Sequence, residues 1–158
     1  MNASACITPS ECRAAFDALL ARTSRELRLY DRDLDLWQLD EAARHAALRA
    51  LCVAGGGRRV EFLLDDTRLI PRTLPRLMQL VRDFSHVLVI RQVDPDTPRP
   101  DHACVLADRH AILVRANKAS PHGTLHLDDP ARAAAFHQDF ESLWQRAQAP
   151  LSATTLGL

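Results

Sequence analysis

Apolar and polar positions along the chain follow two different periods, which predicts helices alternating with strands. Helical spacing of apolar residues marks four segments, at about residues 9–21, 40–54, 71–83 and 129–144. Alternating or continuous apolar runs typical of strands occupy about residues 26–30, 59–64, 86–91, 102–107, 110–115 and 124–127, the last as an edge strand. This order predicts an α/β fold with a mixed, mostly parallel sheet and helices on both faces.

Local signals define the ends of several elements. Thr8 to Glu11 forms a capping box with Pro9 at the first helical position, so a helix begins there. The continuous apolar run 87–90 is typical of a strand covered on both faces. Three glycines at 55–57 follow a helix and precede a strand, which is the reverse of the order in a phosphate-binding loop. We expect one domain over residues 1–150 and a disordered tail over 151–158.

Composition restricts the function classes. The 158 residues are 47% hydrophobic and 25% charged, and the 20 basic residues balance the 20 acidic ones. This length predicts one domain, and a net charge of zero argues against a strongly basic nucleic-acid binder. Lys118 is the only lysine, so any mechanism that needs a lysine must use it.

The absence of targeting signals in the sequence bears on the expected cellular location and on the expected redox state of the cysteines. There is no apolar run of about 18 residues, and the first ten residues lack the charged and apolar regions of a signal peptide. We therefore expect a cytoplasmic protein with no membrane insertion. The four cysteines show no CxxC pair, which favours free thiols over a disulfide framework.

The region from 102 to 144 contains the most informative motifs. His102 to Asp108 has the sequence H-A-C-V-L-A-D, and a tight turn leads to a second short run that ends in V-R-A-N at Asn117. A glycine-containing loop, a short strand and a helix that ends in F-E-S-L-W follow. This succession resembles one half-unit of the phospholipase D-like superfamily, which carries H-x-K-x4-D, a hairpin, G-S-x-N, a strand and a helix. The resemblance covers nearly the whole chain.

Several positions depart from the family pattern. His102 matches the family nucleophile, but Cys104 stands where the family has its lysine. Asp108 follows His102 by six residues, where the family aspartate follows by seven. Of the G-S-x-N motif only Asn117 matches, and Arg115 stands in place of the serine.

The resemblance implies a chemistry in which histidines from two half-units face one phosphodiester. One histidine attacks phosphorus, the other protonates the leaving group, and the lysines stabilise the developing negative charge. A thiol at Cys104 carries no such charge, although Arg115 could substitute. We therefore expect a catalytically degenerate domain that serves as a binding or regulatory module. A further hypothesis is a regulatory partner of an enzyme that uses the groove for a peptide or metabolite. The alternative is a phosphodiesterase that works as a homodimer with His102 as nucleophile.

The resemblance also places the candidate site. His102, Cys104 and Asn117, with Asp108 and Arg115 as further members, are expected to line one shallow pocket for a phosphate-containing ligand. Structural roles are open for three of them: His102 as a histidine packed at a strand entry, Cys104 as a core residue, and Asp108 as a turn residue. We expect no cofactor and no metal, because the spacing of His102, Cys104, His122 and His126 matches no familiar zinc site.

Four aspartates follow the first two predicted strands, at positions 31, 33, 65 and 66. In an open α/β sheet this is the edge at which ligands usually bind. The aspartates are open to two interpretations: ordinary loop polarity and helix capping, or an acidic mouth that argues against a nucleic-acid substrate.

Overall fold

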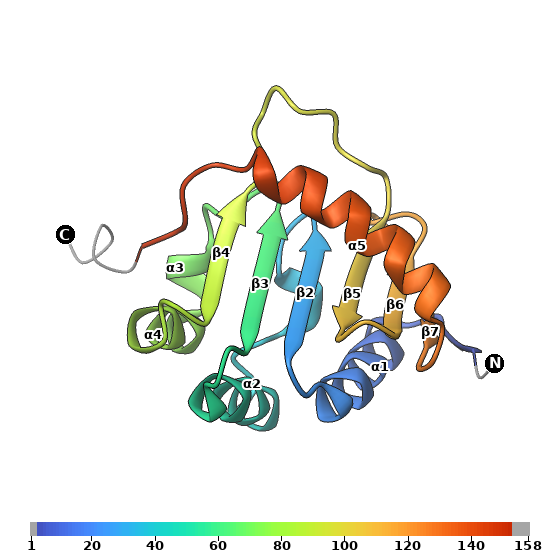
Figure 1. The fold of residues 1–158 in the computed structure, drawn as a ribbon, viewed down its shortest axis with the longest axis horizontal. Coiled ribbons are helices and arrows are strands. Elements are labelled where there is room, and N and C mark those ends of the chain that lie inside the picture. Colours follow the sequence, from blue (N-terminus) through green and yellow to red (C-terminus); the bar gives the residue numbers. More distant parts are fainter. Residues whose placement is uncertain (1–2, 153–158) are drawn as a thin grey trace.

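The computed structural model describes residues 3–152, which form an open seven-stranded sheet with helices on both faces (Figure 1). The elements in chain order are β1 (Ala3–Cys6), α1 (Pro9–Arg22), β2 (Glu26–Asp31), the 3-10 helix η1 (Asp35–Trp37), α2 (Ala42–Ala54), β3 (Arg59–Leu64), α3 (Ile70–Thr73), α4 (Pro75–Asp83), β4 (Leu88–Gln92), β5 (Ala103–Ala107), β6 (Ala111–Arg115), β7 (Gly123–His126) and α5 (Pro130–Gln145).

The strand order is β1-β7-β6-β5-β2-β3-β4. β2, β3 and β4 are parallel to one another, because a helix connects each to the next. β5 is antiparallel to β2, and β6, β7 and β1 continue the antiparallel half. The predicted mixed sheet is confirmed. The expectation that it is mostly parallel is wrong, since within residues 3–152 two pairings are parallel and four are antiparallel.

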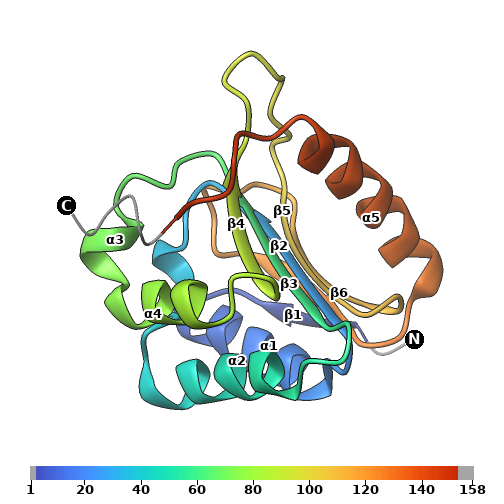
Figure 2. The ribbon, with the colours of Figure 1, turned by 60° about the vertical axis from the view of Figure 1, so that its left-hand side comes forward.

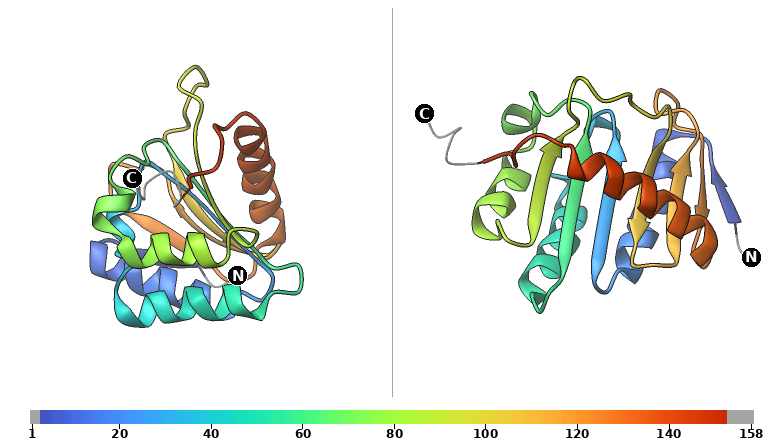
Figure 3. Two further views of the ribbon diagram at one scale, coloured as in Figure 1. Left: turned by 90° about the vertical axis from the view of Figure 1, so that its left-hand side faces the viewer. Right: turned by 45° about the horizontal axis from the view of Figure 1, so that its top comes forward.

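The helices divide unequally between the two faces. Figure 2 shows α1, α2 and α4 on one face and α5 alone on the other. α5 crosses several strands obliquely, as the right-hand view of Figure 3 shows. A large apolar cluster fills the three-helix side, and a smaller one lies under α5. Along β2, Leu27 and Leu29 belong to the large cluster while Tyr30 belongs to the small one, as the alternation of a strand requires.

Two helices illustrate how the sequence determines their ends. At α1, the Thr8 side chain accepts from the Glu11 N–H while Glu11 accepts from the Thr8 N–H, so the predicted capping box is present. The predicted helix over 71–83 is divided into α3 and α4. Leu74 has φ −129° and ψ 61° because Pro75 disfavours helical geometry in the residue before it.

The chain ends differ from the prediction. β1 was not predicted, and it pairs with β7, so β7 is not an edge strand. After α5 the C-terminal segment, residues 148–151, returns along β4. There the Gln148 N–H donates to Gln92 O and the Leu151 N–H donates to Ile90 O. The first residue of the expected disordered tail is therefore held, and residues 153–158 lie outside the described residues.

The run 87–90, expected to be a strand covered on both faces, is covered incompletely. Val89 is half-buried, because β4 lies at the edge of the sheet. All four cysteines are free and buried, and the Cys6 and Cys12 sulfur atoms are 2.7 Å apart where β1 meets α1.

Within residues 3–152, no helix combines the length and the apolar character that crossing a membrane requires.

Candidate functional site

The antiparallel pairing of β5 with β2 brings the start of β5 to the carboxyl ends of β2 and β3. Tyr30, near the end of β2, lies opposite Cys104 on β5. The loop from β4 to β5 and the loop from β6 to β7 reach the same side, where the Lys118 N–H donates to Asp101 O at 2.8 Å. We call this the carboxyl edge of the sheet (Figure 1).

His102 lies at this edge, directly before β5. Its ring packs between two aromatic rings, with centroid distances of 5.9 Å to Tyr30 and 4.9 Å to Phe136. Burial lowers the pKa of His102 below its ordinary value, and the positive charge of Lys118 lowers it further. The carboxylates of Asp139 and Asp101 act in the opposite direction. The imidazole is therefore half-buried and neutral near pH 7.

Cys104 shares the face of His102, as the two-residue spacing requires, but it does not line a pocket. It is 3% exposed and packs in the small apolar cluster under α5. Burial raises the pKa of its thiol to about 12, so the group is neutral. The structure thus gives Cys104 the position of a core residue.

Arg115 does not join His102. It points to the opposite face, where its guanidinium carbon lies 5.7 Å from the centre of the Trp37 ring. Its three nitrogens contact Asp31 Oδ2 at 2.5 Å, Ser120 O at 2.8 Å and Lys118 O at 2.6 Å. The expectation that Arg115 lines the pocket is wrong, because the register that places it opposite Ala103 turns it away from α5.

Asp108 lies at the other end of β5 from His102. Its carboxylate accepts from the N–H groups of Ser24, Arg25 and Glu26, at 2.8 to 3.1 Å. Its φ of 54° is the left-handed conformation of a hairpin turn. Asp108 is therefore not part of a pocket with His102: a five-residue strand separates the two.

Asn117 lies at the carboxyl edge in the loop between β6 and β7, and it is exposed. Its Oδ1 accepts from the Ala119 N–H at 2.9 Å, so the side chain shapes its own loop. Of the five residues expected to line one pocket, the structure brings His102 and the loop of Asn117 to the same edge.

A group that the motif comparison missed meets His102 at Tyr30. Lys118 Nζ lies 2.5 Å from Asp65 Oδ2 and 3.0 Å from Tyr30 Oη, and the Tyr30 hydroxyl donates to Asp65 Oδ1 at 2.7 Å. Arg99 Nε lies 3.7 Å from the same carboxylate. We call these four residues with His102 the Lys118 cluster. The sequence signals were a single lysine and an aspartate directly after a predicted strand.

A second charged group lies under α5 toward the amino ends of β2 and β3. Arg28, 3% exposed, contacts Glu61 at 2.9 Å, Glu141 at 2.7 Å and Glu26 at 3.6 Å. The His137 ring nitrogen Nδ1 lies 3.3 Å from Arg28 Nη1. We call these five residues the Arg28 cluster. Beside it lies a cavity of about 680 Å³, which Arg59 and Arg109 also line.

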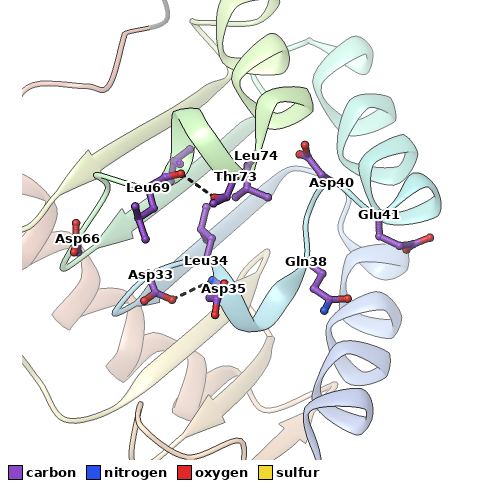
Figure 4. Close-up of a pocket in the computed structure, with 11 residues that line it drawn as sticks. Asp33, Leu34, Asp35, Gln38, Asp40, Glu41, Asp66, Leu69, Thr73 and Leu74 are labelled. Atoms are coloured by element: carbon purple, nitrogen blue, oxygen red, sulfur yellow. Dashed lines mark hydrogen bonds between the residues drawn. The ribbon is translucent and has the colours of Figure 1, made fainter. Parts of the chain in front are cut away.

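The four aspartates at the carboxyl ends of β2 and β3 and in the loops that follow separate into two pairs. Asp31 and Asp65 are engaged with Arg115 and Lys118. Asp33 and Asp66 line a cavity of about 520 Å³ between η1 and α3 (Figure 4). Asp33 accepts from the Asp35 N–H at 3.0 Å, and Asp66 pairs with Arg68 at 2.8 Å.

Two more carboxylates of this cavity cap helices. Asp40 accepts from the N–H groups that begin α4, and Glu41 accepts from those that begin α2. The structure thus favours loop polarity and capping for these acidic residues.

Within residues 3–152, no three His, Cys, Asp or Glu side chains are arranged to hold a metal ion.

The family to which the sequence belongs is known from a family model. The model described as "Domain of unknown function (DUF7931)" matches residues 8–153. The chain belongs to this family. No curated protein matches the DUF7931 chain.

Solved structures show the fold of the DUF7931 chain in other proteins. Nuc from Salmonella typhimurium, a phospholipase D family member, matches with a TM-score of 0.68 and 13% identity. The match covers 96% of this chain and 98% of Nuc. The archaeal chromatin protein TrmBL2, described with a novel mode of DNA binding, matches with a TM-score of 0.69 and 16% identity over 96% of this chain. The DUF7931 chain spans 54% of the TrmBL2 chain, about half.

Phosphatidylserine synthase from Haemophilus influenzae Rd KW20 matches with a TM-score of 0.65 and 18% identity. The match covers 98% of the DUF7931 chain and 40% of the synthase. The DUF7931 chain therefore has the fold of the phospholipase D-like superfamily. At these identities the likeness concerns the fold.

Proposed function

We propose that this DUF7931 chain is a catalytically degenerate phospholipase D-like domain that binds a phosphate-containing ligand at His102. The observation that carries this proposal is the state of Cys104. It stands where the resemblance places a lysine, and it is a neutral, buried thiol with a pKa of about 12. β5 therefore supplies no ammonium for the negative charge that develops on phosphoryl oxygens in a transition state.

The position of His102 supports a binding role. The imidazole is half-buried between Tyr30 and Phe136 at the carboxyl edge, and its lowered pKa keeps it neutral. A neutral imidazole can donate one hydrogen bond to a phosphate oxygen. The ligand we expect is a phosphate-containing small molecule, and a protein partner is the alternative. Zero net charge argues against nucleic acid, and we propose a cytoplasmic location.

A second candidate is a phosphodiesterase that acts as a homodimer with His102 as nucleophile. The same lowered pKa favours it, because only a neutral imidazole can attack phosphorus. The resemblance implies that two histidines face one phosphodiester, and a single half-unit contains one such residue. A homodimer would supply the second.

Hydrolysis of bis-p-nitrophenyl phosphate separates the two candidates. We expect negligible turnover by the wild type. Calorimetry with inorganic phosphate should show weak binding that falls about tenfold in His102→Ala, because a hydrogen bond to an anion is lost. His122→Ala, an exposed loop histidine, is the matched control and should bind as the wild type does. Turnover that disappears in His102→Ala would overturn the degenerate role and favour the enzyme.

The oligomeric state is tested separately by light scattering at tens of micromolar. We propose a homodimer, and a monomeric mass at this concentration would contradict it.

A further inference from the structure

Lys118 lies in the loop between β6 and β7, whereas His102 directly precedes β5. The backbone bond from Lys118 N–H to Asp101 O fixes the loop between β6 and β7 beside the residue that precedes His102. The side chain is 17% exposed, so the ammonium is close to solvent and still well sheltered. The lysine is thus held at the carboxyl edge by its own backbone.

Tyr30 is the common neighbour of the lysine and the histidine. Lys118 Nζ lies 5.2 Å from the centre of the Tyr30 ring, and the His102 ring lies 5.9 Å from that centre. The charge of Lys118 is near enough to lower the pKa of His102. Because a phosphate group accepts hydrogen bonds from several directions, one such group at this edge can face both side chains.

The carboxylate of Asp65 is the anion that the two cations of this cluster contact. Its side chain is 9% exposed, and its two oxygens accept from the Tyr30 hydroxyl and from Lys118 Nζ, with Arg99 Nε at 3.7 Å. Two cations and one hydroxyl therefore converge on a single carboxylate. Phosphate oxygens make the same charge-assisted hydrogen bonds as carboxylate oxygens.

We propose that Lys118 supplies, from the loop between β6 and β7, the positive charge that Cys104 does not supply. In this arrangement Asp65 holds the ammonium and so weakens the binding of phosphate groups. The inference rests on the proposed phosphate site at His102. The site then binds a phosphate monoester or diester weakly, because Asp65 neutralises the charge of Lys118. The affinity depends on whether Asp65 or the ligand contacts the ammonium.

The carboxylates of Asp139 and Asp101 raise the pKa of His102. Asp101 belongs to the loop before β5, and Asp139 belongs to α5. Their negative charge opposes an incoming phosphate, which adds to the weak affinity that the inference implies.

The decisive variants are Asp65→Asn and Lys118→Met, measured by calorimetry with inorganic phosphate. Asp65→Asn keeps the shape of the side chain and releases the ammonium, so affinity should rise about tenfold, which corresponds to about 1.4 kcal/mol. Lys118→Met should lower affinity, and the double variant should lose the gain of Asp65→Asn. Glycerol 3-phosphate and a nucleoside monophosphate as further probes distinguish a lipid-type from a nucleotide-type source of the phosphate.

The adjacent Asp66→Asn is the matched control. This carboxylate pairs with Arg68 and lines the cavity between η1 and α3, so its loss should leave phosphate affinity unchanged. An equal gain in Asp66→Asn would mean a general effect of charge and would overturn the inference.

Two outcomes separate this inference from the proposed function. If His102→Ala abolishes phosphate binding while Asp65→Asn and Lys118→Met bind as the wild type does, the site stands and the role of Lys118 is wrong. If no variant and no wild-type sample binds phosphate, both are wrong. Should Asp65→Asn fail to fold, Lys118→Arg against Lys118→Met decides, because the arginine retains the charge and should retain binding.

Discussion

The two charged clusters on the α5 side of the sheet differ in balance and in access to solvent. In the Arg28 cluster, one buried cation faces three carboxylates, and Arg59 and Arg109 add positive charge at its margin. In the Lys118 cluster, one carboxylate faces two cations and a hydroxyl at an open edge. Both groups lie on or beside β2, at opposite ends.

This difference supports a structural role for the Arg28 cluster and is consistent with the binding role proposed for the Lys118 cluster. Arg28 is 3% exposed, and its partners come from β2, β3 and α5, so its ion pairs join the helix to the sheet. The cations of the Lys118 cluster exceed its carboxylates, and Arg99 is 40% exposed. An anion from solution can reach cations at an open edge, and it then competes with Asp65 for them. It cannot reach a buried cation that is surrounded by carboxylates.

The largest expected effect is on stability when the buried cation is removed. Arg28→Met leaves Glu26 and Glu61 buried without their central partner, which should lower the free energy of unfolding by about 3–5 kcal/mol. Lys118→Met should cost about 1 kcal/mol, because Asp65 retains Arg99 and the Tyr30 hydroxyl. Urea unfolding followed by circular dichroism measures both.

Arg59→Met is the control for the Arg28 variant. Its side chain is 51% exposed, and its pair with Glu26 should contribute less than about 1 kcal/mol. Equal losses for Arg28→Met and Lys118→Met would remove the distinction between the two clusters.

An intermediate effect is expected at Asp108. Asp108→Ala leaves the N–H groups of Ser24, Arg25 and Glu26 without their acceptor and should cost about 1–3 kcal/mol. Because Asp108 lies at the opposite end of β5 from His102, phosphate binding should not change. Thermal unfolding and calorimetry on the same sample test both statements, and a loss of phosphate affinity in the folded variant would return Asp108 to the site.

The smallest effect concerns pH. Burial lowers the pKa of His137 below its ordinary value, and the positive charges of Arg109 and Arg28 lower it further. The hydrogen bond with Asp108 O and the negative charge of Glu26 raise the pKa in part. As pH falls from 7.5 to 5.5, His137 binds a proton more readily in the unfolded chain than in the folded chain. The free energy of unfolding should therefore decrease.

His137→Gln should make this pH dependence shallower, and unfolding midpoints at the two pH values measure the change. His102→Gln is the comparison at the other cluster, since its pKa is lowered too. An unchanged pH dependence in His137→Gln would show that this histidine does not titrate differently in the two states.

The fold was predictable from the sequence where the periodic pattern was strong. The strands near 26–30 and 59–64 and the capped helix α1 follow directly from apolar spacing and from the Thr8–Glu11 pair. β1 was not predictable, because its four residues A-S-A-C show no alternation and form a strand through pairing with β7. The break at Leu74 could have been inferred from the proline that follows it.

The candidate site was predictable in part. The motif predicts His102 as a site residue, and this stays a prediction; its shared face with Cys104 follows from strand geometry. Lys118 and Asp65 were not found, because 53 positions separate them in sequence and only the crossing from β4 to β5 brings their elements together. The side of the sheet to which Arg115 points depends on register, which no local motif specifies.

The C-terminal segment that lies along β4 has a consequence for how the molecule meets other copies of itself. A bare edge strand presents free N–H and C=O groups that can add a strand from another chain, which is a common route to aggregation. On that edge, the N–H groups of Gln148 and Leu151 donate to the carbonyl groups of Gln92 and Ile90. The Arg91 side chain also holds the segment, because it donates to Gln148 O, Trp144 O and Ala147 O. The chain thereby protects the parallel end of its own sheet from intermolecular strand pairing.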